Sequence, residues 1–291
     1  MAFNWSTFRT RAFTALVFVA VMMFGLLYNN WSLFLLLSVI YFGCLWEYCG
    51  LIEKICSAPI HIYIKLGCAL LGYHVLLFLT GDHLELGGYG IKSSFSLPFL
   101  IAGMVLFIPG IFKMQGITKK MLLLLFGGLF YTALPLGLLL NLAAPQAPVP
   151  AHFGSFIVIY IIGSLWINDT MAYLCGSIIG RTSLSKISPK KTWEGTISGI
   201  ILSPSLTWLL FSLIFFHSAQ WPLVSVGAAI SGLAAIFGTL GDLLESKIKR
   251  MANVKDSGHI MPGHGGFLDR FDSLLIAVPA VWLFLSIYHL F

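Results

Sequence analysis

Long apolar stretches separated by short polar segments run along nearly the whole chain. About twenty consecutive apolar residues are enough for a helix to cross the hydrocarbon core of a bilayer. By that rule the sequence predicts about nine membrane helices, near residues 11–28, 31–46, 63–81, 95–113, 121–142, 154–177, 196–217, 222–245 and 270–290. The second stretch is short, and the fourth contains Pro109. The pattern predicts an all-α fold, a polytopic bundle of transmembrane helices.

The composition supports this class of protein. Hydrophobic residues make up 58% of the 291 residues and charged residues 10%, against about 45–50% and about 25% in ordinary soluble domains. The mean hydropathy is +0.91. No long polar linker separates the apolar stretches, so we expect one integral membrane domain. The five cysteines form no CxxC pair, which argues against a zinc site or a disulfide framework.

The basic residues are distributed unevenly between the predicted loops. With a cytoplasmic N-terminus and nine crossings, all of the seventeen Lys and Arg except Lys92 fall in or beside inside segments. This is the bias that the positive-inside rule describes. We therefore expect the polar motif loops of this integral protein to face the cytosol, and we assign the membrane to the bacterial cytoplasmic (inner) membrane as a separate expectation.

The first segment with candidate chemistry starts at Asp169, within the sixth predicted helix. This carboxylate would lie roughly 12 Å from the helix end, and an intramembrane carboxylate is a functional hypothesis by default. A polar clamp with Asn168 or Thr170 is the structural alternative. The segment ends in the run 188–195, Ser-Pro-Lys-Lys-Thr-Trp-Glu-Gly. Anionic lipid headgroups would explain its lysines, but Glu194 and the hydroxyls favour contact with a ligand.

The second segment, residues 241–272, contains five of the eleven acidic and five of the seventeen basic residues of the chain. At 100° per residue, Asp242, Ser246 and Lys249 share one face of the eighth helix. Asp269 and Asp272 lie on one side of the first turn of the ninth. Charge close to a bilayer is costly unless it is paired, bound to a metal or bound to a charged ligand. The cluster therefore indicates a phosphate-and-metal site.

The loop between these two helices contains the run Pro-Gly-His-Gly-Gly at 262–266. Glycines allow backbone N–H groups to approach phosphate oxygens closely. A set of carboxylate oxygens suits Mg²⁺ rather than zinc. His264 has no Cys or His partner at ligand spacing, so we expect it to donate a hydrogen bond rather than to bind metal.

Both segments resemble the motifs of one known family. The runs at 246–250, 255–258, 262–266 and 269–272 are similar to the signature of the CDP-diacylglycerol synthases, or phosphatidate cytidylyltransferases. Asp169 and the run 188–195 resemble a second motif of that family. All of these motifs lie in the C-terminal part of the chain, whereas the segment 1–150 matches only as generic membrane helices.

The resemblance implies transfer of the cytidylyl group of CTP to phosphatidate, with release of pyrophosphate and with Mg²⁺ as cofactor; a second cation is left open. It makes 151–291 the catalytic transmembrane region with two cytoplasmic motif loops, after an N-terminal region, 1–150, of about five helices. The residues expected to be catalytic are Asp242, Asp269, Asp272 and Lys249. The expected metal ligands are Asp242, Asp256, Asp269 and Asp272, with Asp242 and Asp269 binding directly. The residues expected to bind substrate are Asp169, Ser188, Lys190, Lys191, Glu194, Ser246, Arg250, Lys255, His264 and Arg270.

Two other classes of protein remain open. A CTP-dependent lipid-alcohol kinase, of the polyprenol or dolichol type, would also bring a nucleotide to a membrane substrate. An anion transporter is the non-enzyme alternative, although transporters often show two similar halves and here the motifs crowd the C-terminal half. No nucleic-acid partner is expected. Gly127-Gly128 and the Gly227-x-x-x-Ser231 spacing fit close helix packing, within the chain or in a homodimer.

The charge distribution makes a testable prediction about topology. If both motif loops serve one active site, segments 180–195 and 246–268 face the cytosol, and Phe291, one crossing later, lies outside. Single cysteines at Ser185 and at the C-terminus, on a cysteine-free background, test this with a membrane-impermeant thiol reagent applied to intact cells. We expect the C-terminal position alone to be modified. Labelling of the motif loop from outside would place it where no CTP exists.

Overall fold

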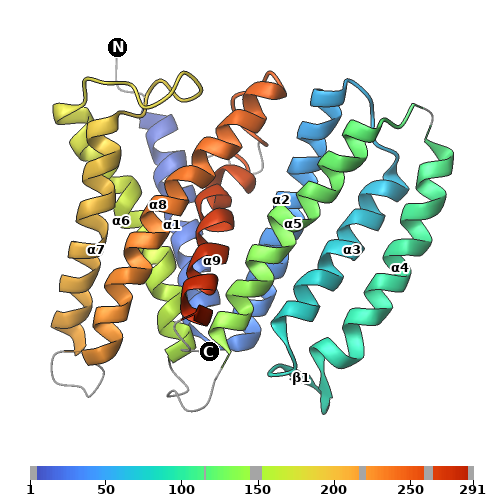
Figure 1. Cartoon of the computed structure of the whole chain (residues 1–291), viewed down its shortest axis with the longest axis horizontal. Coiled ribbons are helices and arrows are strands. Elements are labelled where there is room, and N and C mark those ends of the chain that lie inside the picture. The colour runs from blue at the N-terminus through green and yellow to red at the C-terminus, as the bar shows by residue number, and fades with distance from the viewer. Residues whose placement is uncertain (1–4, 115, 145–152, 216–220, 259–264, 288–291) are drawn as a thin grey trace. The chain divides into compact units, whose positions relative to one another are not determined.

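The computed structural model describes residues 5–114, 116–144, 153–215, 221–258 and 265–287. Within these ranges the chain is almost entirely helical (Figure 1). The helices are α1 (Trp5–Leu27), α2 (Asn30–Cys56), α3 (Ile62–Thr80), α4 (Ile91–Lys113), α5 (Lys119–Ala143), α6 (Phe153–Ile179), α7 (Trp193–Phe215), α8 (Trp221–Met251) and α9 (Leu268–Ile287). A two-stranded hairpin, β1 (Glu85–Leu86) with β2 (Tyr89–Gly90), connects α3 to α4. The predicted all-α, polytopic helical fold is confirmed.

Seven helices in the described ranges, namely α2 to α6, α8 and α9, are long and apolar enough to cross a membrane. The predicted end of the second helix at residue 46 was wrong, because α2 continues to Cys56. The apolar pattern fades where Glu47 and Glu53 appear, but neither carboxylate is left without a partner. Glu53 forms an ion pair of 2.9 Å with Lys65, and the contacts of Glu47 are described below. A helix can therefore keep its length through charged positions whose partners come from elsewhere in the chain.

Proline does not interrupt the fourth helix. α4 runs through both Pro98 and Pro109 as one element. Prolines are tolerated in membrane helices because neighbouring groups and local adjustment can satisfy the carbonyls that they leave free. The prediction of one helix at this place is confirmed.

The chain divides into two compact units. The first contains Met1–Ala144 and Ile248–Phe271, and the second contains Pro145–Lys247 and Asp272–Phe291. Because the boundaries fall inside α8 and α9, each of these helices contributes residues to both units. The functional division of the chain after residue 150 stays a prediction.

In the first unit, two tyrosines of α2 fit against glycines on neighbouring helices. The Tyr41 hydroxyl donates to the backbone oxygen of Ala69 at 2.8 Å, and Gly72 on α3 leaves room for its ring. The Tyr48 hydroxyl donates to the backbone oxygen of Leu124 at 3.2 Å, and the ring lies against Gly128 on α5. These contacts fix α2 against α3 and α5, and they explain Gly128 as a position for close packing within the chain.

Helices α3 and α4 lie side by side (Figure 1) and approach closely through glycines. A Cβ atom at Gly103 would lie 2.9 Å from the backbone nitrogen of Leu71, and one at Gly110 would lie 2.9 Å from that of Ile64. Gly67 on α3 faces the backbone of Phe107 in the same way. Small residues of this kind let the backbones of membrane helices pack directly against each other.

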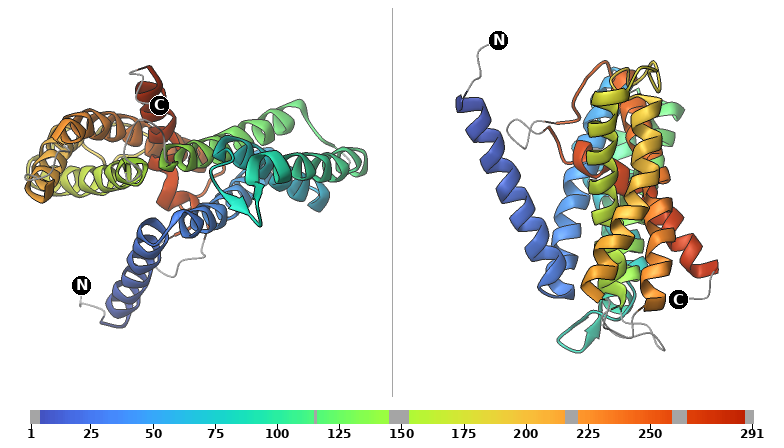
Figure 2. Two further views of the ribbon diagram at one scale, coloured as in Figure 1. Left: turned by 90° about the horizontal axis from the view of Figure 1, so that it is seen from below. Right: turned by 90° about the vertical axis from the view of Figure 1, so that its left-hand side faces the viewer.

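In the second unit, α6 and α7 run alongside each other (Figure 2), and buried hydroxyls join them to α8. The Ser203 hydroxyl donates to the backbone oxygen of Ser164 at 2.8 Å. The Ser231 hydroxyl donates to the hydroxyls of Ser164 at 2.7 Å and Thr207 at 3.0 Å. Hydroxyl bonds across membrane helices hold such bundles together. The Gly227-x-x-x-Ser231 spacing therefore serves packing within the chain here, because Gly227 also lies against the ring of Tyr160.

The glycine contacts between α3 and α4 predict a loss of stability on overpacking. Gly103→Leu would force a side chain into backbone atoms of α3, and overpacking of this kind costs about 1–3 kcal/mol. Gly127→Leu on α5 is the matched control, because a Cβ atom at Gly127 meets no atom within 4 Å. Thermal unfolding of the two variants in detergent should show a lower midpoint for Gly103→Leu alone. Equal midpoints would contradict the close approach of the two helices.

Candidate functional site

A cavity of about 550 Å³ opens between α6, α7 and α8 in the second unit. Its wall includes Asn168 and Asp169 from α6, Lys190 and Lys191 from the loop before α7, and Asp242 from α8. Polar and charged side chains from three parts of the sequence thus face one space among apolar helices. The structure brings Asp169, Lys190, Lys191 and Asp242 together, although three separate segments of the chain supply them.

Lys191 and Asp242 form an ion pair across this cavity. Their side chains are 29% and 26% exposed, so the pair is reached by solvent rather than sealed in the core. The Ser246 hydroxyl donates to the Oδ1 atom of Asp242 at 3.3 Å, one helical turn further along α8. Asp242 therefore interacts with a lysine of the first motif segment through one oxygen and with a hydroxyl of the second through the other.

Asp169 contributes a carboxylate to the same cavity. Its Oδ1 atom accepts a long hydrogen bond of 3.4 Å from the Nδ2 atom of Asn168, whereas the Thr170 hydroxyl bonds to the backbone oxygen of Trp166 instead. A clamp with Thr170 is thus absent from the described contacts. Asn168 is 2% exposed, its Oδ1 atom has no hydrogen-bond partner, and it lies against Gly199 of α7. The side-chain oxygen of Asn168 can therefore still accept a hydrogen bond.

Asp272 on α9 adds a carboxyl group to the second unit. It is 8% exposed, and its Oδ1 atom accepts the backbone N–H of Ser273 at 2.6 Å. Asp169 and Asp242 both lie within electrostatic range of it, as does Lys191. A cation bound near these three carboxyl groups would favour their charged forms.

Glu194 orders the loop that carries Lys190 and Lys191. Its carboxylate accepts the backbone N–H groups of Arg181 and Thr182, both at 3.2 Å, and the Thr182 hydroxyl at 2.9 Å. Hydrogen bonds to its own backbone and to Thr182 lower the pKa of Glu194 from 4.5 to about 2, and Arg181 adds to this effect. Glu194 lies at the loop end of α7, before the predicted span. The described contacts give it a role within the loop, while contact with substrate stays a prediction.

The base of the same loop is closed by backbone pairing. Leu184 N–H donates to the backbone oxygen of Lys191 at 2.8 Å, and Trp193 N–H donates to that of Thr182 at 2.9 Å. Thr192 packs against Gly176, Gly180 and Gly195, where any side chain would collide with it. These glycines therefore let the loop return tightly onto the end of α6.

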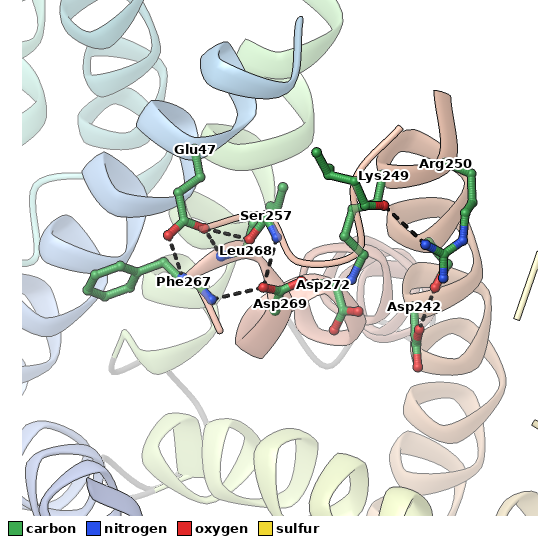
Figure 3. A network of polar contacts seen from close by, with 12 residues as sticks. Glu47, Asp242, Lys249, Arg250, Ser257, Phe267, Leu268, Asp269 and Asp272 are labelled. Atoms are coloured by element: carbon green, nitrogen blue, oxygen red, sulfur yellow. Dashed lines mark hydrogen bonds and ion pairs between the residues drawn. The ribbon is translucent and has the colours of Figure 1, made fainter. Parts of the chain in front are cut away.

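A second group of charged side chains lies in the first unit. The Lys249 amine contacts the Oδ1 atom of Asp269 at 2.7 Å, and both side chains are more than four-fifths buried. The Oδ2 atom of Asp269 accepts the backbone N–H groups of Ser257 at 3.0 Å and Gly266 at 2.8 Å (Figure 3). Asp269 thus holds the two described ends of the motif loop together while its other oxygen meets a lysine.

A residue that the sequence did not single out, Glu47 on α2, anchors the same loop. Its carboxylate is directed at Ser257, Phe267 and Leu268 (Figure 3). It is 6% exposed. The apolar pattern gave one signal for it, a lone acid inside a membrane helix, which is functional by default. Its contacts lie some 210 residues further along the chain, so no local motif points to it.

The remaining predicted residues lie in the motif loops or in the helix ends beside them. Ser188 is half-buried in the turn before Lys191, to which its backbone oxygen is bonded at 3.1 Å. The exposed side chains are those of Arg250, Lys255, Asp256 and Arg270. His264 lies outside the described residues.

The donor set fits a hard cation, although the described residues contain no group of three His, Cys, Asp or Glu side chains able to hold a metal. Mg²⁺ usually takes one or two carboxylates together with water and substrate phosphates, so a ready three-ligand cage is not required. The carboxylates of Asp242 and Asp272 belong to the second unit, and that of Asp269 belongs to the first. Their role in metal binding stays a prediction.

Comparison with known proteins identifies the family to which this protein belongs. The fold is that of a polytopic helical membrane protein, and acidic and basic side chains line the cavity among α6, α7 and α8. The model of the cytidylyltransferase family matches residues 9–288. The chain belongs to this family.

Among its relatives, the chain is 38% identical over 202 residues to a phosphatidate cytidylyltransferase of Synechocystis, covering 64% of this chain and 67% of that protein. It is 40% identical over 139 residues to the phosphatidate cytidylyltransferase of Bacillus subtilis, covering 47% and 50%. It is 43% identical over 141 residues to the chloroplastic phosphatidate cytidylyltransferase 5 of Arabidopsis thaliana, covering 47% and 34%. The alignments thus span two thirds of the first relative and half or less of the other two.

The contacts of Glu194 predict a change in loop stability. A carboxylate whose pKa is lowered on folding stabilises the loop above about pH 4.5 and loses this effect only as the pH falls toward about 2. At pH 8, Glu194→Gln should therefore speed tryptic cleavage at Lys186, Lys190 and Lys191, by roughly two- to fivefold for an exposed carboxylate. Glu85→Gln, on the exposed strand β1, is the control. An unchanged cleavage rate in Glu194→Gln would show that backbone pairing alone holds the loop.

Proposed function

We propose that this protein transfers the cytidylyl group of CTP to phosphatidate, giving CDP-diacylglycerol and pyrophosphate. A phosphate oxygen of phosphatidate attacks the α-phosphorus of CTP, and the bond from that phosphorus to the bridging oxygen of the β-phosphate breaks. The departing pyrophosphate carries the electron pair of that bond. Family membership and the names of the relatives support this reaction.

The cavity among α6, α7 and α8 is the observation that carries the proposal. A diacylglycerol phosphate presents an anion at the membrane surface while its acyl chains stay between helices. Lys190 and Lys191 line the cavity and supply the positive charge that a phosphate monoester requires. We assign these lysines and Ser188 to the phosphatidate headgroup. We also assign Asp169, which lines the same cavity, to substrate binding.

The first unit supplies the groups that we assign to CTP. Lys249 is positioned by Asp269, and the exposed Arg250, Lys255 and Arg270 surround the same motif loop in sequence. Lysine and arginine near a nucleotide triphosphate offset its negative charge and that of the departing pyrophosphate. Since both substrates are anions, this positive charge acts by positioning and electrostatics and requires no protein nucleophile.

Mg²⁺ fits the same scheme. When bound, it would neutralise phosphate charge and polarise the phosphoryl oxygens. We propose Asp242, in the second unit, and Asp269, in the first, as direct ligands of Mg²⁺, and Asp272 and Asp256 as the further candidate carboxylates. Asp242 also pairs with Lys191, and Asp269 pairs with Lys249. We place the reaction at the cytoplasmic face of a bacterial inner membrane, where phosphatidate and CTP meet.

A transporter or a lipid-alcohol kinase is not favoured. The family match extends over residues 9–288, and the relatives reported above are named for phosphatidate. An assay can distinguish the two alternatives by their substrates and products. A kinase would consume CTP with a polyprenol and release CDP, and a transporter would move anions without added nucleotide.

Purified protein in detergent, given labelled CTP, Mg²⁺ and phosphatidate, should form labelled CDP-diacylglycerol. Phosphatidate replaced by polyprenol should give no product.

Lys191→Ala should raise the apparent KM for phosphatidate about tenfold or more and that for CTP less, because it removes a headgroup contact and the partner of Asp242. Asp269→Asn should lower kcat by orders of magnitude while the protein still folds.

The outcomes separate the parts of this proposal. Turnover with polyprenol but not with phosphatidate would replace the reaction by the kinase. A larger effect of Lys191→Ala on CTP than on phosphatidate would reverse the assignment of substrates to the two loops. Full turnover of Asp269→Asn at saturating Mg²⁺ would remove Asp269 from the metal site.

A further inference from the structure

The contacts of Glu47 connect the N-terminal helices to the second motif segment. Its Oε1 atom accepts the backbone N–H of Phe267 at 2.9 Å. Its Oε2 atom accepts the Ser257 hydroxyl at 2.7 Å and the backbone N–H of Leu268 at 2.9 Å. One buried carboxylate is thus bonded to both described ends of the loop and to the first residue of α9.

The glycines of the loop are shaped around this carboxylate. A Cβ atom at Gly258 or at Gly266 would collide with the carboxylate oxygens of Glu47. Gly43, one turn earlier on α2, similarly leaves room for the ring of Phe267. The close approach therefore involves α2 and both described ends of the loop, and a larger residue at any of these positions would displace the carboxylate or the loop.

The bonds of Glu47 lead directly to Asp269. Leu268, whose N–H Glu47 accepts, is the residue before Asp269, and Ser257 is bonded to both carboxylates. Glu47 also places a negative charge at the start of α9, where the unpaired N–H groups of the helix favour it. Asp269 in turn holds Lys249. A carboxylate from α2 thereby fixes the residue that orients the lysine.

We propose that Glu47 is a positioning residue of the nucleotide-binding loop, acting through Leu268 and Asp269 on Lys249. Burying a carboxylate in a membrane protein is costly unless every bond is made, and here three donors meet it. A merely structural pair on the same helix exists for comparison. Glu53 accepts the backbone N–H of Ile60 at 2.7 Å and pairs with Lys65, away from the motif loops.

The variants follow from the bonding pattern. Glu47→Gln keeps the size but replaces one accepting oxygen by an NH₂ group, which cannot accept the N–H of Phe267 or of Leu268. Glu47→Asp keeps the charge and both oxygens but is shorter by one methylene. Glu53→Gln is the matched control. Ser257→Ala removes one of the three bonds and leaves the carboxylate intact, which provides a milder variant if Glu47→Gln fails to fold.

Hydrogen–deuterium exchange measures the anchoring without any assay of activity. In the full-length protein in detergent, Glu47→Gln should speed exchange of the amides of 265–269, Ser257→Ala should do so less, and Glu53→Gln should leave them unchanged. Exchange in both Glu47→Gln and Ser257→Ala equal to that of the wild type would overturn the inference. This measurement remains decisive even if the protein proves inactive on CTP and phosphatidate, in which case the proposed function fails and the anchoring does not.

Kinetics then test positioning, which rests on the proposed function. Partners that orient active-site groups typically contribute roughly 10–100-fold to affinity or activity. Glu47→Gln should lower kcat/KM for CTP within that range with the KM for phosphatidate unchanged, and Glu47→Asp should recover part of the loss. Glu53→Gln should keep both values. Faster loop exchange with an unchanged kcat/KM for CTP would show that Glu47 only stabilises the fold, and would overturn its role in positioning.

Discussion

The need to satisfy every carboxylate buried among apolar helices governs how this protein is built. An unpaired carboxylate in such surroundings costs several kcal/mol or changes its charge. Asp269 meets two backbone N–H groups and Lys249, and Glu47 meets two N–H groups and a hydroxyl. Each satisfied carboxylate fixes a stretch of backbone. The hydrogen bonds that offset the burial of Glu47 and Asp269 therefore also hold the motif loop in place.

The helices could be predicted from the apolar pattern because a membrane-spanning helix needs only about twenty consecutive apolar residues, which can be read directly from the sequence. The helix end that was predicted wrongly lies where charged residues occur within a helix. The second helix was ended at residue 46, although α2 continues to Cys56, since groups outside the helix provide hydrogen bonds to Glu47 and an ion pair to Glu53. The spacing of Asp242, Ser246 and Lys249 could likewise be derived from helix geometry, because all three lie on the single helix α8.

What sequence reasoning could not supply are the contacts between distant segments. The pairing of Lys191 with Asp242 joins the loop before α7 to the helix after it, and no local pattern encodes it. Glu47 was missed for the same reason. Family motifs pointed to Asp269 but not to Glu47, which holds its loop, because no motif was recognised in the segment 1–150, although the family model matches residues 9–288.

The way the chain is shared between the two units has a consequence for dissecting the protein. Ile248–Phe271 belongs to the same compact unit as Met1–Ala144. A C-terminal fragment that starts after residue 150 would keep every family motif, yet it would lack α2 and leave the N–H groups of Phe267 and Leu268 without their acceptor. Part of the motif-rich half thus shares a compact unit with the N-terminal helices. The recognisable motifs cluster in the C-terminal half of the sequence, whereas the first compact unit contains residues from both halves of the chain.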